Sequence, residues 1–328
     1  MQKRPLGFSD LQLTTIGFGA WAIGGDNWEW GWGPQQDQDS LATIQKALDL
    51  GINWIDTAAA YGLGHSEEIV GQAIQGRREE LIIATKCGLV WEDPSNGQVI
   101  NHLKAESVRR EAEASLRRMN LDVIDIYQVH WPVPDVDLEE AWSEIALLIE
   151  EGKVRYGGLS NADVNQIERC QAIHPVASLQ PPYSMLDRGV EYELLTFCAE
   201  NNIGVLAYSP MGSGLLTGKY TRERVEALPA EDWRLTKESH FQEPELTANL
   251  ELVKKLDDIA RRQNRSVGEL AVAWVLRRPE LTAAIVGSRR PDQIEQIAPA
   301  SNWQLDEHII QEINSLLEER DQKVAIVA

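Results

Sequence analysis

Hydrophobic residues along the chain form two alternating patterns. Short apolar runs, typical of buried strands, lie at 15–21, 53–58, 81–88, 123–130, 155–161, 177–183, 204–210 and 283–288. Between them lie longer stretches with apolar residues at helical spacing. In 37–51, Leu41, Ile44 and Leu48 fall on one helix face, and Gly51 follows as a stop. Strand and helix therefore alternate from one end of the chain to the other.

This alternation, with no linker or break in composition, predicts an α/β fold: a closed (β/α)8 TIM barrel in one domain over residues 1–318. Two short extended runs joined by a turn within residues 3–19 predict an N-terminal β-hairpin. We interpret the charged, proline-containing stretch 211–247 as a surface excursion. Residues 319–328 are expected to form a C-terminal tail, and the sequence leaves open whether it is disordered or packs on the barrel.

Composition excludes several classes of protein. Lys and Arg number 31 and Asp and Glu number 51, so the net charge of −20 disfavours a nucleic-acid partner. No run of about 18 apolar residues predicts a membrane span, and no leader is evident, so we expect a cytoplasmic protein. The three cysteines are far apart and predict buried free thiols, with no metal site. No long apolar face demands a partner, so a monomer is the default expectation.

Four reactive side chains lie at or just after predicted strand ends: Asp56, Tyr61, Lys86 and His130. In a barrel the carboxyl ends of the strands meet at one mouth, so these groups are expected to converge. A phenol of pKa about 10 keeps its proton at neutral pH, and a nearby ammonium stabilises the phenolate. A carboxylate would hold the lysine, and a histidine would orient a substrate oxygen. The set can protonate an oxygen that becomes an alkoxide, but it needs a cofactor to supply a hydride.

Six segments carry a resemblance to a known family: DTAAAYGLGHSE (56–67), TKCG (85–88), YQVHW (127–131), GLSN (158–161), YSPMGSGLLTGKY (208–220) and AIVGSRRPDQIEQ (284–296). In order and spacing they resemble the aldo-keto reductases, closest to the bacterial stress-response and inositol-locus reductases. The resemblance implies an oxidoreductase that reduces aldehydes and ketones with NADP(H). It also implies that Asp56, Tyr61, Lys86 and His130 form the catalytic tetrad, with Tyr61 as general acid.

The resemblance further implies a cofactor site. Ser160, Asn161 and Gln180 match positions that bond the nicotinamide carboxamide, and Tyr208 matches the residue that stacks on the ring. The expected pyrophosphate loop comprises Ser209, Met211, Gly212, Gly214, Leu215 and Lys219. Ser288 and Arg289 match positions used for the 2′-phosphate, and Gln293 and Gln296 match contacts to adenosine.

Two positions depart from the family pattern. Gln293 stands where many members carry Arg, and Ile297 stands where many carry Asn. The first departure removes a phosphate partner that Arg290 would have to replace. The strictness of NADPH over NADH is therefore left open.

The segment GGDNWEWGWGPQ (24–35) places three tryptophans at alternate positions in a glycine-rich run, which predicts a loop with an apolar face. Because it follows the first barrel strand, it is expected at the catalytic mouth. We predict that Trp21, Trp30, Trp91 and Trp131 line a pocket for a small carbonyl substrate, either an apolar aldehyde or a sugar-like compound.

Two other functions fit parts of the sequence. Some relatives of this fold are cofactor-binding regulatory subunits with little turnover. A Schiff-base lyase would use Lys86 as its nucleophile, since strand-end lysines in barrels also serve that chemistry.

Overall fold

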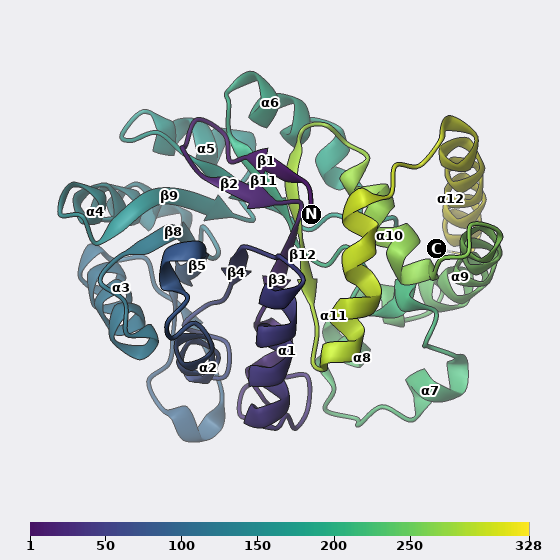
Figure 1. Ribbon diagram of the computed structural model, residues 1–328, viewed down its shortest axis with the longest axis horizontal. Coiled ribbons are helices and arrows are strands. Elements are labelled where there is room, and N and C mark those ends of the chain that lie inside the picture. The colour runs from purple at the N-terminus through teal and green to yellow at the C-terminus, as the bar shows by residue number, and fades with distance from the viewer. Residues whose placement is uncertain (328) are drawn as a thin grey trace.

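Eight strands pair in parallel and close into a barrel in the computed structural model, which describes residues 1–327 (Figure 1). The strands follow one another around the barrel in chain order, and the expected TIM barrel is confirmed. They are β3 (Ile16–Gly19), β4 (Trp54–Asp56), β5 (Ile82–Cys87), β8 (Ile124–Val129), β9 (Val154–Ser160), β10 (Ser178–Gln180), β11 (Gly204–Ala207) and β12 (Leu281–Gly287).

Helices surround the strands (Figure 1). Those that follow successive strands are α1 (Asp37–Asp49), α2 (His65–Ala73), α3 (Ala105–Met119), α4 (Leu138–Glu150), α5 (Val164–Gln171), α6 (Leu194–Glu200), α10 (Val267–Leu276) and α11 (Pro291–Ile297). Helix α1 ends as expected, with Gly51 in the left-handed conformation at φ +86°.

The predicted N-terminal hairpin is confirmed, and it closes the amino-terminal end of the barrel. Strand β1 (Lys3–Pro5) pairs antiparallel with β2 (Gln12–Thr14). Leu6, Leu11 and Leu13 of this hairpin pack against the first residues of barrel strands, including Trp54 and Ile82. Any open mouth of the barrel must therefore lie at the carboxyl ends of the strands.

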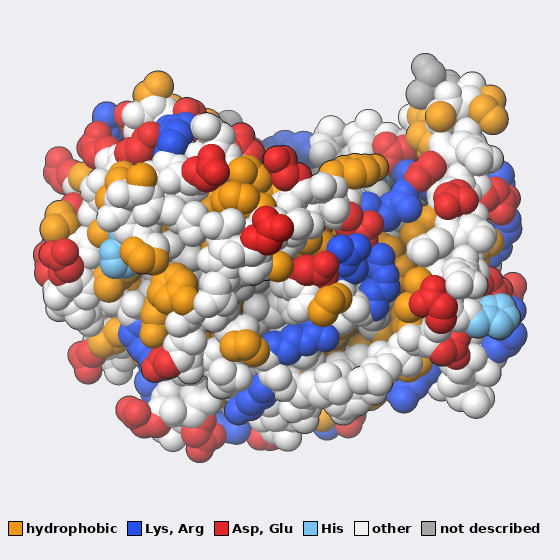
Figure 2. Space-filling model, turned by 90° about the horizontal axis from the view of Figure 1, so that it is seen from above, with side chains coloured by type: hydrophobic (Ala, Val, Ile, Leu, Met, Phe, Trp, Pro, Cys, Tyr) orange, Lys and Arg blue, Asp and Glu red, His pale blue; other side chains and the backbone are white. Residues whose placement is uncertain are grey.

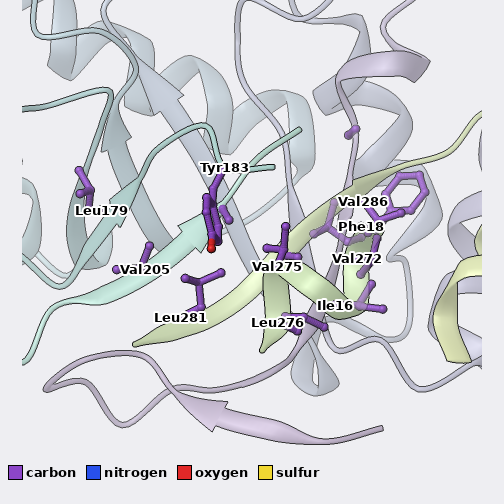
Figure 3. Packing of buried hydrophobic residues seen from close by; sticks show 14 of the residues in the cluster. Ile16, Phe18, Leu179, Tyr183, Val205, Val272, Val275, Leu276, Leu281 and Val286 are labelled. Atoms are coloured by element: carbon purple, nitrogen blue, oxygen red, sulfur yellow. The ribbon is translucent and has the colours of Figure 1, made fainter. Parts of the chain in front are cut away.

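Small residues inside the barrel make room for one large indole. A Cβ built on Gly17 would lie 2.0 Å from Cε2 of Trp54, so the glycine is required by the approach of that ring. The Trp54 Nε1 donates to the carbonyl of Thr14 at 2.9 Å, so the buried indole is satisfied. Alternate residues of β3 point outward, where Ile16 and Phe18 belong to the same outer core as residues of α10 such as Val272 (Figure 3).

The C-terminal residues continue a long helix. Helix α12 (Glu307–Val327) lies beside α9 (Glu245–Arg262) at the edge of the molecule (Figure 1). Ion pairs join the two helices, with Lys255 Nζ at 2.6 Å from Glu319 and Lys323 Nζ at 2.7 Å from Glu251. Residues 319–327 of the expected tail are thus helical, with Glu319 and Lys323 paired to α9, and Ala328 lies outside the described residues.

The excursion 211–247 differs from the irregular surface stretch that we expected. It contains α7 (Arg222–Glu226), α8 (Trp233–Lys237) and two short 3₁₀ helices, at Leu215–Thr217 and Ser239–Phe241. Trp233 is only 4% exposed. The stretch folds inward because this indole packs against Trp21, Trp30 and Trp32.

Acidic and basic side chains are mixed on the surface, although the acidic ones are in excess. Acidic and basic side chains are interspersed on the face shown in Figure 2, and many of them form ion pairs of the kind that join α9 and α12. Cys87, Cys170 and Cys198 are buried free thiols, as expected. Among residues 1–327 there is no helix with both the length and the apolar character needed to cross a bilayer.

Candidate active site

The four predicted reactive residues meet at the carboxyl ends of three adjacent strands. Asp56 is the last residue of β4, Lys86 lies near the end of β5, and His130 directly follows β8. Tyr61 lies in the turn after β4, and its ring is brought back over the strand ends. Strand β5 pairs with β4 on one side and β8 on the other, so parallel pairing places the four groups at one mouth.

Lys86 is the centre of the cluster. Its Nζ donates to Asp56 Oδ2 at 2.7 Å, to the carbonyl of Thr57 at 2.9 Å and to Tyr61 Oη at 3.2 Å. The lysine and the aspartate are both buried. All three donor positions of an ammonium are thereby used, and one of them is directed at the phenol.

Burial and nearby charge together shift the pKa values of Lys86 and Tyr61. Burial lowers the pKa of Lys86, and the adjacent Asp56 opposes that effect. Burial also raises the pKa of Tyr61 well above its ordinary value, with a further increase from Asp56. The phenol therefore holds its proton across the physiological range, next to an ammonium that would stabilise its anion.

His130 stands beside the phenol as a neutral ring. Its centroid lies 5.7 Å from that of Tyr61 at an interplanar angle of 79°. Burial, together with the charge of Lys86, lowers the pKa of His130 well below its ordinary value. A neutral imidazole can donate one hydrogen bond to a substrate oxygen without competing with Tyr61 as the acid.

The second carboxylate oxygen of Asp56 is held from across the barrel. The side-chain amide of Gln180 donates to Asp56 Oδ1 at 2.7 Å and to Gln128 Oε1 at 3.3 Å. The sequence reasoning missed Gln128. It lies near the end of β8, two residues before His130, and the period of an extended chain could have placed both side chains on one face.

The cluster opens into a single large cavity of about 1070 Å³. Of the four predicted substrate-binding tryptophans, Trp21, Trp30 and Trp131 line it. Trp91 is not among the lining residues. It follows the short strand β6 (Leu89–Val90), and in the hairpin that β6 forms with β7 (Ile100–Asn101) the cavity is lined by Leu89 and Asn101 instead.

Trp28, Trp32 and Trp233 complete the aromatic wall. The Trp233 ring stacks on Trp21 at 5.0 Å, and Trp21 stacks in turn on Tyr61 at 6.3 Å and 24°. Trp233 was missed because it lies 200 residues beyond the tryptophan-rich loop, in a charged stretch. The only sign in the sequence that this residue is buried was a single tryptophan among polar residues.

The predicted nicotinamide contacts lie beside the tetrad. Asn161 Nδ2 donates to the carbonyl of His130 at 3.0 Å, and its Oδ1 accepts from Tyr208 Oη at 2.8 Å. Ser160 Oγ donates to the carbonyl of Gln180 at 2.9 Å. Tyr208, which lines the cavity, is thus held in place through its hydroxyl.

Most of the other predicted cofactor residues lie along the remainder of the cavity. Those that line it are Ser209, Met211, Gly214, Lys219, Ser288, Arg289, Gln293 and Gln296. Gly212 and Leu215 belong to the same loop but do not line the cavity, and the side chain of Leu215 is in the core.

Two features of this region fit a phosphate-bearing ligand. Ser288 Oγ is buried without a hydrogen-bond partner among the described residues. Gly214 has φ +91° and precedes a 3₁₀ turn, so the backbone there approaches the cavity without a side chain. Lys219 and Arg290 add positive charge, and both are exposed.

Comparison with known proteins identifies the family. The sequence model described as "Aldo/keto reductase family" matches residues 15–318, so the chain belongs to this family. It is 39% identical over 321 residues to the aldo-keto reductase YhdN of Bacillus subtilis (strain 168), covering 97% of this chain and 94% of that protein. It is 36% identical to an NADH-specific methylglyoxal reductase of Escherichia coli (strain K12), covering 94% and 95%.

A solved structure supports the same assignment. A glycerol dehydrogenase from Gluconobacter oxydans matches with a TM-score of 0.87 and 34% identity, covering 97% of this chain and 96% of that one. Aldo-keto reductases are oxidoreductases that act on carbonyl compounds with nicotinamide cofactors. The protein is therefore an oxidoreductase of this class, built on the barrel described above.

Proposed function

We propose that this protein is an NADP(H)-dependent carbonyl reductase in which Tyr61 is the general acid. The observation that carries the proposal is the position of Lys86, whose Nζ bonds to both Asp56 and Tyr61 at the floor of the cavity. Nothing in that arrangement favours a lyase, because a lysine with three hydrogen bonds and a buried carboxylate partner is held as a cation.

A bound nicotinamide cofactor would supply the hydride that adds to the carbonyl carbon. The chain's own residues do the rest. Tyr61 donates its proton to the carbonyl oxygen as negative charge develops there, and Lys86 stabilises the resulting phenolate. Asp56 keeps Lys86 charged and in place, and His130 orients the substrate oxygen. The products are the alcohol, the oxidised cofactor and a phenolate that takes a proton back from solvent.

The choice of NADP(H) rests on charge at the far end of the cavity. Lys219, Ser288 and Arg290 would bind the 2′-phosphate, on a protein whose overall charge is −20. One relative is named NADH-specific, so the test must compare both cofactors. Titration by quenching of tryptophan fluorescence should give a dissociation constant about tenfold lower for NADPH than for NADH. Equal values, or tighter NADH, would refute this assignment.

The acid is tested with 4-nitrobenzaldehyde as substrate, with NADPH oxidation followed by absorbance. Tyr61→Phe should lower kcat by about 10²–10⁴-fold while NADPH affinity stays unchanged. Tyr192→Phe is the matched control, because that ring is 91% exposed, and it should behave as wild type. Wild-type protein that binds NADPH tightly but turns over no carbonyl compound would make it a cofactor-binding regulatory subunit instead.

A further inference from the structure

The guanidinium of Arg289 is already hydrogen-bonded to other residues of the protein, so it is not free to bind a phosphate. Its Nε donates to Gln35 Oε1 at 2.8 Å, and its Nη1 donates to the carbonyl of Trp32 at 2.8 Å. Its Nη2 donates to the carbonyls of Gly33, at 3.2 Å, and Pro34. Four of the five N–H donors of the guanidinium are thus used.

All four acceptors belong to one segment, residues 24–35, which we call the Trp loop. Gln35 also donates from its Nε2 to the backbone carbonyl of Arg289 at 2.9 Å, so the contact is reciprocal. The backbone N–H of Arg289 is in turn fixed by Gln293 Oε1 at 2.8 Å, at the start of α11. The guanidinium therefore ties the loop after β3 to the turn after β12.

The contact leads directly to the reacting phenol. The Trp32 ring packs edge-on against Trp21 at 5.4 Å, and Trp21 stacks on Tyr61. Trp21 Nε1 also donates to the carbonyl of Trp30 at 3.0 Å, so the loop backbone positions that indole too. Displacement of residues 32–34 would shift the aromatic wall that faces the acid.

We propose that Arg289 is a positioning residue that fastens the Trp loop and thereby shapes the tryptophan wall of the substrate pocket. A 2′-phosphate can take only the single remaining N–H of Arg289 unless the fastening is broken. The neighbouring Arg290 has the opposite character: it is exposed, and its guanidinium bonds only to Asp292 among the described residues. Phosphate recognition and loop positioning are thereby divided between two adjacent arginines.

The loop has a second point of attachment, which predicts which part Arg289 controls. Lys237 of α8 forms an ion pair with Glu29 at 2.7 Å and lies 3.8 Å from the centroid of the Trp30 ring. Arg289 acts at 32–35 and Lys237 acts at 29–30. Loss of Arg289 should therefore loosen the loop without detaching it.

The first test needs neither cofactor nor turnover, so it is independent of the proposed function. Hydrogen–deuterium exchange would be measured over residues 24–36 in wild type, Arg289→Met and Arg290→Met. The amide of Gly31, which donates to the carbonyl of Trp28 at 3.0 Å, is a suitable reporter. Arg289→Met should exchange about tenfold faster there, since several hydrogen bonds are lost, and Arg290→Met should match wild type. Wild-type exchange in Arg289→Met would overturn the proposal.

The second test separates fastening from phosphate binding. With NADH, which lacks the phosphate, Arg289→Met should raise KM for an aldehyde by about tenfold. A pure phosphate ligand would instead raise the dissociation constant of NADPH and leave the KM measured with NADH unchanged. Gln35→Ala keeps the guanidinium but removes one of its partners. It should therefore give a smaller increase in both the amide exchange of the Trp loop and the KM measured with NADH. This variant serves as the test if Arg289→Met does not fold.

Discussion

Lys86 Nζ and Asp56 Oδ2 lie 2.7 Å apart, and their side chains are 0% and 4% exposed. The ion pair is therefore removed from water, where each charge depends on the other. The same contact reaches the phenol, because the lysine that Asp56 holds also bonds to Tyr61. If Tyr61 is the acid, as proposed, stability and catalysis at this site are linked through one carboxylate.

Asp56→Asn should destabilise the fold as well as the active site. Removal of one charge of a buried pair leaves the other uncompensated, at a cost of about 3–5 kcal/mol in the free energy of unfolding. The double variant Asp56→Asn with Lys86→Met removes both charges and should recover part of that loss. Urea denaturation at neutral pH measures all three proteins. The prediction fails if Asp56→Asn is as stable as wild type and the double variant is no more stable than Asp56→Asn. The ion pair would then contribute little to the free energy of unfolding.

Glu111 predicts a pH dependence of stability outside the tetrad. This carboxyl is buried on α3 and accepts from the Gly88 amide at 2.9 Å and from Ser107 Oγ at 3.0 Å. Burial raises its pKa to about 7, although both hydrogen bonds oppose the shift. Below pH about 4.5 the folded and unfolded states both hold the proton. Between 4.5 and 7 only the folded state does, so stability falls by up to about 3 kcal/mol, and above 7 the loss is constant.

Glu111→Gln isolates this contribution, because the amide oxygen can accept from the Gly88 N–H while the amide NH2 donates to Ser107 Oγ, without a titrating charge. The variant should gain stability relative to wild type as the pH rises from 5 to 8. Thermal unfolding across that range measures the difference. Glu106→Gln, at an exposed position on the same helix, is the control and should show no such trend. A difference that did not vary with pH would mean that Glu111 ionises in the folded protein as it does in water.

Trp30 and Trp91 form a matched pair for the substrate pocket. Trp30 lines the cavity, whereas Trp91, equally half-buried, does not. Trp30→Ala should raise KM for aromatic aldehydes by about tenfold through loss of indole contact, with little change in NADPH affinity. Trp91→Ala should leave KM unchanged. Steady-state kinetics over a panel of aldehydes would decide, and equal effects of the two substitutions would contradict the assignment of the wall.

Local pattern determined much of the fold of this protein. Alternating strand and helix signals predicted the barrel, because a parallel sheet needs a helical connection after each strand. The convergence of Asp56, Lys86 and His130 was predictable from the same rule, since all three lie where successive strands end, and closure of a barrel brings such ends together. A terminal glycine and a turn sequence were enough for the end of α1 and for the hairpin, because those features depend on adjacent residues.

Contacts between distant segments were decided only by the tertiary structure. Trp233 joins Trp21 and Trp32 because an excursion from β11 folds over a loop from β3, and no periodicity connects the two stretches. The sequence marked Arg289 as basic, but the partners of its guanidinium are carbonyls more than 250 residues away. Hydrogen-bond acceptors on the backbone carry no residue identity. A sequence can therefore show that a charge is present, but only the folded chain decides what that charge holds.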